Sequence, residues 1–224
     1  MALSEAGGDR FDDGMSLDAD PGTTTVSPAE GFRLAAAHAV RLTAAVPADA
    51  WDDPALGQWT VRSLVGHLGR AMSTVVDALT TPATEATVSS AADYYRQVLD
   101  RVDPDAIRLR GEQAGTALGD DPAAALRTLA DRAGAALAQT GDRLVTTAAG
   151  GMWLSHYLPT RTFELAVHGL DLARATGQPA TVPTPVLREA LALVTELAVH
   201  RGHGESVLLA LTGRAALPTG FGVL

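Results

Sequence analysis

The amino-acid sequence predicts an all-α protein, and three features of the 224-residue chain support this prediction. Hydrophobic residues make up 46% of the chain but aromatic residues only 4%, so Ala, Leu and Val must build most of the core. That mixture favours close-packed helices over sheets of β-branched strands. Apolar residues recur at helical spacing in several long segments, and most of these segments open with a polar capping residue followed by proline.

Residues 1–26 are rich in Gly, Asp, Ser and Thr, and a disordered acidic leader is expected there. The capping box Ser-Pro-Ala-Glu at positions 27–30 starts a helix that is expected to reach about Val46, before the next proline. His38 lies near the apolar stripe of this helix. A partly buried structural histidine is favoured there over a metal ligand.

Residues 51–59 are expected to form a loop that leads into a second long helix, capped by Thr60. Its apolar positions share one side of the helix, and His67 lies along the edge of that side. His67 can therefore point into a cleft between helices without occupying the middle of the core. A linker of Thr, Pro and Ala, residues 80–88, leads into a third helix, predicted over residues 89–102.

Asp103, Asp121 and Thr184 are each followed by proline, and each is expected to open a further helix. The helix that begins at Thr184 carries an apolar stripe to about position 201. These elements assign residues 27–202 to a helical bundle. Residues 203–224 are expected to add a short helix and an extended tail that packs on the bundle.

Residues 143–157 contain two adjacent glycines and show no helical stripe, so a loop is expected there, placed where it can cover a site. Trp153 and His156 could line a pocket, although a structural role is favoured for both. His200 and His203 are spaced like a short metal-binding loop. Their position near a helix end favours a polar C-terminus that interacts with the helix dipole.

The segment 158–177 carries the most informative pattern in the chain. Arg161, Glu164, His168 and Asp171 stand at helical spacing and form one polar stripe, with apolar residues on both sides of it. Burying either flank brings this stripe to the edge of the core, where its polar groups need partners. The stripe therefore predicts an internal polar site.

The overall composition excludes several classes of protein. The formal net charge is -9, the pI is about 5.0, and all basic residues are arginines, which argues against nucleic-acid and membrane-surface partners. No apolar run reaches the roughly 18 residues that a membrane span needs, and no signal pattern opens the chain, so a cytoplasmic location is expected. There are no cysteines, which excludes disulfides, thiolate ligands and a cysteine nucleophile.

Glu164 and His168 are four residues apart, so both side chains project from the same face of a helix and can bind one cation. A carboxylate and an imidazole are ligands that zinc accepts, and a catalytic zinc site needs about three protein ligands and an open position. His67 is the candidate third ligand. Such a pair alone is a weak signal, since this spacing is common in helices.

Three stretches together resemble the maleylpyruvate isomerase N-terminal family, a group of the DinB-like metal-binding four-helix bundles that contains mycothiol-dependent enzymes. They are QWTVRSLVGHLGR (58–70), LPTRTFELAVHGLDLA (158–173) and LLALTGRAALPTGFGVL (208–224). The resemblance implies a DinB-like up-down four-helix bundle with extra short helices and a short C-terminal extension. It also implies a divalent metal, most often Zn2+, with Ni2+ or Fe2+ as alternatives, on His67, Glu164 and His168.

The function that this resemblance implies is a metal-dependent transferase or isomerase that uses mycothiol or a similar thiol. Its partners would be the small-molecule thiol and a small electrophile, and a homodimer is compatible with the sequence. Arg161 could hold a carboxylate or orient Glu164, although a pair with Glu164 within the helix is as well supported. Asp171 could accept a hydrogen bond from a ligating imidazole, or contact a neighbouring arginine.

Two other functions stay open: a metal-dependent hydrolase that activates water, and a non-catalytic, metal-stabilised bundle that binds a small molecule. In the isomerases of the family, a further domain follows the bundle and supplies an arginine to the active site. The chain has only a short extension there, which argues against maleylpyruvate isomerisation itself. Arg214 stands in the part most similar to the end of that domain, and whether it reaches the site is left open.

Overall fold

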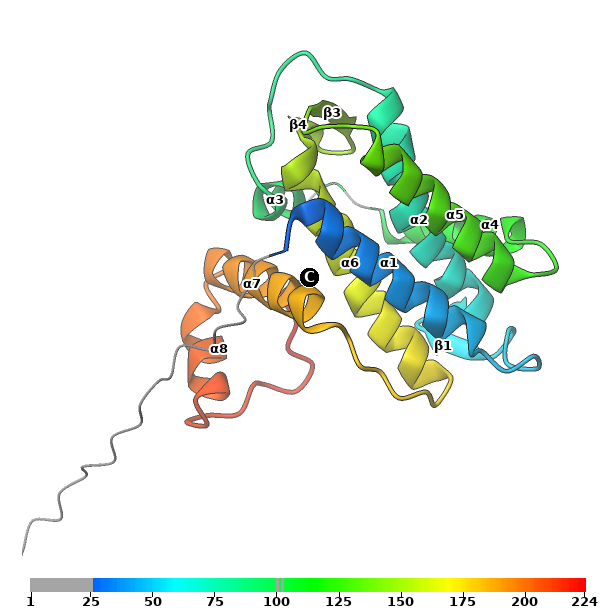
Figure 1. Ribbon diagram of the computed structural model, residues 1–224. Coiled ribbons are helices and arrows are strands. Elements are labelled where there is room, and N and C mark those ends of the chain that lie inside the picture. The colour runs from blue at the N-terminus through cyan, green and yellow to red at the C-terminus, as the bar shows by residue number, and fades with distance from the viewer. Residues whose placement is uncertain (1–25, 100, 102) are drawn as a thin grey trace, which may run out of the picture.

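The computed structural model describes residues 26–99, 101 and 103–224. The predicted all-α fold is confirmed: within these residues, helices carry the structure and two hairpins of very short strands connect them (Figure 1). The predicted leader lies, but for its last residue, outside the described part. In chain order the elements are α1 (Pro28–Ala44), β1 (Pro54–Leu56), β2 (Trp59–Thr60), α2 (Val61–Thr80), α3 (Ala91–Leu99), α4 (Pro104–Ala117), α5 (Pro122–Ala138), β3 (Leu144–Thr147), β4 (Gly150–Trp153), α6 (Leu154–Ala175), α7 (Thr184–His200) and α8 (Gly204–Leu211).

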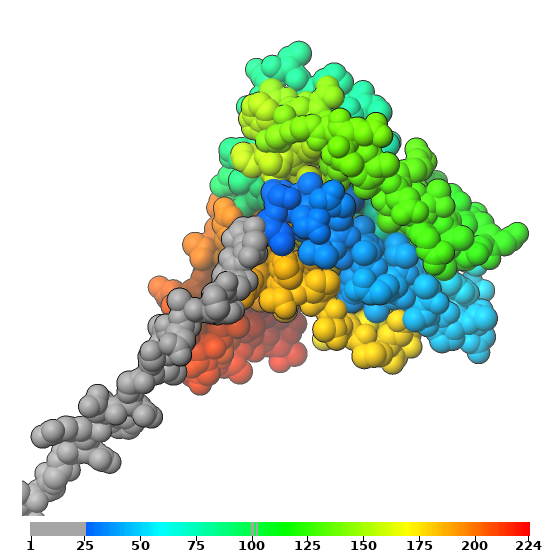
Figure 2. All heavy atoms as spheres, viewed as in Figure 1, coloured from blue at the N-terminus to red at the C-terminus, as the bar shows by residue number. Residues whose placement is uncertain are grey.

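Four helices, α1, α2, α5 and α6, form a bundle around one core. α1 packs against α5 and α6, and α2 packs against the same two helices, so α1 and α2 lie across a diagonal of the bundle. α1 and α6 run in one direction and α2 and α5 in the other (Figure 1). α4 packs along α2, and α7 packs against α6. On the face shown in Figure 2, α5, α1 and α7 lie in succession.

The helix starts follow the capping residues of the sequence. The side chains of Ser27, Thr60, Asp103 and Asp121 each accept a hydrogen bond from a backbone N–H in the first turn that follows. Such a cap satisfies one of the N–H groups that a helix leaves without a partner, and losing it typically costs about 1 kcal/mol. Each start is thus encoded by chemistry within a few residues, and the structure confirms all four.

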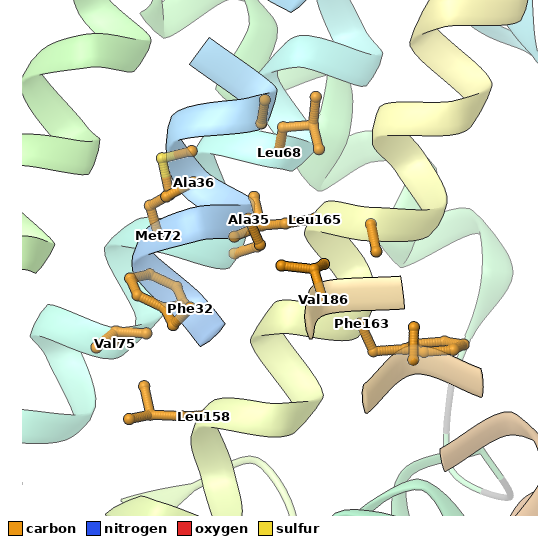
Figure 3. Packing of buried hydrophobic residues seen from close by; sticks show 14 of the residues in the cluster. Phe32, Ala35, Ala36, Leu68, Met72, Val75, Leu158, Phe163, Leu165 and Val186 are labelled. Atoms are coloured by element: carbon orange, nitrogen blue, oxygen red, sulfur yellow. The ribbon is translucent and has the colours of Figure 1, made fainter. Parts of the chain in front are cut away.

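The core is built from aliphatic side chains of the bundle helices and α7. Figure 3 shows side chains of α1, α2, α6 and α7 turned into a shared interior. Full burial of a Leu, Phe or Met side chain stabilises the fold by roughly 1.5–3 kcal/mol before entropy is counted. The largest fully buried side chains are Phe32, Leu64, Leu68, Met72, Leu126, Met152, Leu165, Leu172 and Leu197.

The prediction of a loop over residues 143–157 is wrong. β3 and β4 pair there as an antiparallel hairpin, and the last four residues form the first turn of α6. The linker after α2 runs alongside, and the backbone N–H groups of Thr87 and Val88 donate to the carbonyl oxygen of Gly151 at 2.8 and 3.0 Å. A Cβ at Gly151 would collide with the backbone of Glu85. The two glycines therefore serve close strand packing and not an irregular loop.

α6 is longer than the predicted helix and α3 is shorter. α6 begins at Leu154 although Pro159 lies in its second turn, and the first turn is held by Ser155, whose backbone N–H and hydroxyl both donate to Asp142 at 2.8 Å. α3 begins two residues after the expected start, because Ser90 caps it by accepting from the backbone N–H of Asp93 at 3.1 Å. Both differences concern ends and not the helices themselves.

The segment after α7 packs loosely on the rest of the chain. α8 contains no buried residue, whereas Val223 near the end of the chain is buried. The ring of Phe221 stands edge-on to the imidazole of His203, with 5.3 Å between ring centres. Among the described residues, no helix combines the length and the apolar character that crossing a bilayer requires.

Candidate metal centre

The polar stripe of α6 lies at the edge of the core, as the helical spacing predicts. Arg161, Glu164, His168 and Asp171 are all of intermediate exposure, and they are flanked by buried residues on either side. The side chains of Glu164 and His168 expose only 19% and 18% of their surface. A carboxylate so far removed from water needs hydrogen bonds or a counter-charge.

His67 of α2 meets this stripe from the opposite side. Its Nε2 lies 3.3 Å from Oε2 of Glu164, and Nε2 of His168 lies 3.4 Å from the same oxygen. One donor atom from each of the three residues falls within 4.8 Å of the others. The predicted ligands from two helices, 97 residues apart in the chain, thus converge on one point.

The spacing of these donor atoms fits a small divalent cation. Zinc lies about 2.0–2.1 Å from nitrogen and carboxylate oxygen ligands, and at tetrahedral angles two such ligands are roughly 3.3–3.4 Å apart. The two nitrogen–oxygen distances of 3.3 and 3.4 Å match that separation. Two imidazoles and one carboxylate are also a donor set that zinc, nickel and ferrous ions accept. The residues therefore fit the metal that the sequence implies.

A neighbouring side chain contacts each of the two imidazoles. Nδ1 of His168 lies 3.0 Å from Oδ2 of Asp171, and a proton on that nitrogen leaves the lone pair of Nε2 free for a cation. The imidazole of His67 lies against the indole of Trp59, with ring centres 4.7 Å apart, and the indole N–H donates to the backbone oxygen of Arg108 on α4 at 3.0 Å. Of the two contacts considered for Asp171, the structure shows the one with an imidazole, that of His168.

The charges of the three residues are strongly coupled. Burial opposes charge on Glu164, but hydrogen bonds with His168 and His67 outweigh it and hold the pKa of the carboxyl well below its usual range. Burial likewise opposes charge on His168, yet Asp171 and Glu164 raise its pKa to about 9. Burial lowers the pKa of His67. A cation at this point would compete with protons for the imidazole nitrogens.

Glu164 has a further partner, Tyr95 of α3. The Tyr95 hydroxyl donates to Oε1 of Glu164 at 2.6 Å and lies 3.2 Å from the backbone oxygen of Thr160. Tyr95 is buried, with 4% of its surface exposed, and burial together with the Glu164 charge raises the pKa of its hydroxyl well above the usual value. The phenol therefore stays protonated and donates.

Arg161 lies one turn before Glu164, between two tyrosine rings. The centre of its guanidinium is 5.4 Å from the ring centre of Tyr94 and 5.2 Å from that of Tyr157. Its Nε donates to the Thr160 hydroxyl at 3.0 Å, and its Nη2 donates to the Tyr94 hydroxyl at 3.4 Å. No ion pair with Glu164 joins Arg161 to the stripe among the described residues. The guanidinium is oriented by aromatic faces.

A cavity of about 610 Å³ borders the triad and reaches along α2 to the β3–β4 hairpin. His67, Glu164 and Arg161 line one end of it, and Thr146 and Thr147 of β3 line the other. The hairpin therefore lies at the cavity, as expected for the segment before the Glu164 helix. Apolar side chains of α3 and α4 form much of the wall: Val98, Leu99 and Ile107.

The other sequence-derived candidates lie elsewhere. Arg214 is exposed after α8, where its Nη1 donates to the backbone oxygen of Thr212 at 3.1 Å, and it does not line the cavity. His38 is buried and its Nδ1 lies 3.3 Å from a guanidinium nitrogen of Arg41. The favoured structural interpretation of His38 therefore agrees with its surroundings.

Trp153, His156, His200 and His203 are exposed, and none of them lines the cavity at the triad. Two residues of the site, Tyr95 and Trp59, were not predicted. Trp59 stands in the stretch that resembles the family motif, but nothing local assigns it a contact with His67. Tyr95 carries no signal beyond a pair of adjacent tyrosines in a helix.

Comparisons with known proteins concern the family and the fold of the chain. A family model for the mycothiol maleylpyruvate isomerase N-terminal domain matches residues 32–173, more than half of the chain. A crystal structure of the mycothiol-dependent maleylpyruvate isomerase is similar with a TM-score of 0.52 and 24% identity, over 76% of this chain and 68% of that one. A histidine-to-alanine variant of that isomerase gives 0.48 and 22% over the same shares. No curated protein sequence matches.

Proposed function

The chain belongs to the mycothiol maleylpyruvate isomerase N-terminal domain family, and from that premise we propose that it is a metal-dependent enzyme that uses a small thiol. The thiol is mycothiol or a compound like it, and the reaction is S-transfer to a small electrophile or its isomerisation. The observation that carries the proposal is the convergence of His67, Glu164 and His168 at the end of a cavity large enough for a small-molecule ligand.

His67, Glu164 and His168 would hold the cation, and zinc is the first choice. A divalent cation in this position lowers the pKa of a coordinated thiol and supplies thiolate at neutral pH. Because a cysteine is absent from the chain, the thiol must come from outside. Three protein ligands would leave a fourth position of a tetrahedral ion for the thiol, and His67 and Glu164 line the cavity from which it would approach.

The residues of the chain position the reactants and keep water away. The charge of Arg161 faces the cavity one turn from Glu164, where it can orient an electron-rich or anionic group of the electrophile. Asp171 holds His168, and the apolar wall of α3 and α4 shields the reacting atoms. The thiol would lose its proton to solvent, and its sulfur electron pair would form a C–S bond by addition to a double bond of the electrophile, whose π electrons move to the neighbouring atom. In transfer that atom takes up a proton and the C–S bond stays. In isomerisation the adduct rotates, the C–S bond breaks as the double bond re-forms, and the thiol recovers its proton.

The metal content of untagged protein, measured by elemental analysis, tests the proposal first. The unchanged chain should hold close to one equivalent of metal, and His67→Ala and Glu164→Ala should lose it. His156→Ala is the matched control, because His156 is an exposed histidine of the same α6 helix and lies outside the site. An unchanged chain that takes up no metal, even after metal is added back, would overturn the proposal.

Turnover then distinguishes the remaining candidates. Metal-loaded protein should consume an electrophile only when a thiol is present. Hydrolysis without thiol would instead identify a hydrolase, and metal binding without any turnover would identify a non-catalytic binding bundle. The expected cytoplasmic location and a homodimer stay predictions from the sequence, and light scattering of the purified chain tests the second.

A further inference from the structure

Tyr95 is one of the two residues of the site that were not predicted from the sequence. It lies on α3, outside the bundle, and reaches the stripe of α6 from the side. Its ring packs edge-on against Phe163, with centres 5.5 Å apart, and against Tyr94, with centres 5.6 Å apart. The ring contacts therefore fix the side chain whose hydroxyl donates to Glu164.

The two carboxylate oxygens of Glu164 have different partners. Oε1 accepts from the Tyr95 hydroxyl at 2.6 Å, whereas Oε2 lies 3.3 and 3.4 Å from the two imidazole nitrogens. The distance to Oε1 is at the short end for hydrogen bonds between a hydroxyl and a carboxylate, as is typical of a strong bond. A carboxylate can bind a cation through one oxygen or both, and here one oxygen is already engaged.

The bond between Tyr95 and Oε1 of Glu164 bears on ligand binding because Glu164 lines the cavity. Glu164, His67 and Tyr95 line the cavity, and His168 does not. A second oxygen from Glu164 would therefore compete for a coordination position on the cavity side of the triad. That is the side from which a small-molecule ligand must approach.

We infer that Tyr95 is a positioning residue that keeps Glu164 a one-oxygen ligand and so preserves an open coordination position facing the cavity. The inference rests on the proposed function, because it requires a cation at the triad. It assigns Tyr95 no contact with the reacting atoms. Its effect passes through the orientation of Glu164.

Tyr95→Phe removes the hydroxyl and keeps the ring contacts with Phe163 and Tyr94. The matched control is Tyr94→Phe, which removes the adjacent hydroxyl of the same helix, one that pairs with Arg161 and not with Glu164. Should Tyr95→Phe not fold, Tyr95→Met is the second variant, since methionine fills irregular space and lacks the donor. Circular dichroism of each variant establishes the fold before any metal is added.

Cobalt is the probe, because its visible spectrum reports both coordination number and a bound thiolate. The unchanged chain is titrated with Co2+ against a competing chelator and then with 2-mercaptoethanol. Tyr95→Phe should bind Co2+ roughly 10-fold or more weakly, the loss typical of removing a partner of a metal ligand. It should also show the spectrum of higher coordination and a weaker thiolate band, whereas Tyr94→Phe should match the unchanged chain.

The outcomes separate this inference from the proposed function. An unchanged chain that binds no Co2+ overturns the proposed function itself. If the unchanged chain binds Co2+ and thiol, but Tyr95→Phe has the same affinity and the same spectra, Tyr95 does not position Glu164 and this inference alone is wrong. Equal losses in Tyr95→Phe and Tyr94→Phe would also overturn it, because the effect would then come from the cavity wall and not from the bond to Glu164.

Discussion

Replacing Gly66 with alanine should damage both the stability of the protein and its metal site. Gly66 lies in α2 directly before His67, where the helix meets α4. A Cβ at this position would lie 2.6 Å from the carbonyl carbon of Ala114 and closer still to the backbone nitrogen of Gly115. Contacts shorter than 3.0 Å force a shift. Here the colliding atoms are backbone, so no side chain can rotate away.

The size of the effect follows from these distances. Ordinary contact begins at 3.4 Å, so α2 and α4 must separate by about 1 Å in a close-packed interior. Overpacking of this kind typically costs about 1–3 kcal/mol, and alanine returns about 1 kcal/mol through its better helix propensity. With backbone on both sides the upper end applies, and the expected net loss is about 2 kcal/mol.

The same displacement shifts His67 relative to Glu164. Metal–ligand distances must be right to within about 0.2 Å. A shift of the helix should therefore reduce metal affinity more than it reduces the stability of the fold. Urea unfolding of the metal-free protein measures the first effect, and chelator competition measures the second. Both assays use the full chain.

Gly134→Ala in α5 is the control for this prediction. No atom lies within 4 Å of a Cβ at position 134, so alanine should stabilise the protein by up to about 1 kcal/mol and leave metal binding unchanged. The two glycines thus predict opposite signs for the same substitution. A Gly66→Ala protein as stable as the unchanged chain, or equal destabilisation by both variants, would refute the reasoning.

Three further predictions follow from the pair contacts and charges. Asp171→Asn should weaken metal binding roughly 10-fold or more, because His168 loses its carboxylate partner; unchanged chelator competition would contradict this. Burial lowers the pKa of His38, so the unfolded chain binds a proton there more readily and the free energy of unfolding should fall as pH drops below about 6.5. In His38→Gln this fall should be smaller than in the unchanged chain, as measured by urea midpoints. The Ser89 N–H holds the pKa of Asp93 at about 2; its stabilisation should vanish between pH 4 and 2, and Asp93→Asn should flatten that thermal-midpoint change.

The helices were predictable because their signals are local. Ser27, Thr60, Asp103 and Asp121 each cap a helix through an atom only two or three residues away, so the chain itself carries the start signal. The β3–β4 hairpin was not predictable in this way. Its glycines are required by the linker around residue 87, which lies 64 residues earlier, and no local pattern reveals that pairing.

The candidate site likewise contains residues that a local pattern predicts and residues that only long-range contacts bring in. The i, i+4 spacing of Glu164 and His168 predicts that they share a face, and the helix delivers it. Neither periodicity nor composition selects His67 as their partner with any force, and the family resemblance supplied that choice. Tyr95 meets Glu164 across 69 residues through the packing of α3 on α6, a contact that only tertiary structure reveals.

α4, which is not one of the four bundle helices, also determines the geometry of the site. It approaches α2 closely because Gly66 and Gly115 meet there without side chains, and Gly111 leaves space for the Trp59 indole, where a Cβ would lie 2.6 Å from the ring. That indole in turn lies against His67. The imidazole is thus set by packing that exists before any cation binds. A site prepared in this way would lose little binding free energy in ordering its ligands when a cation binds.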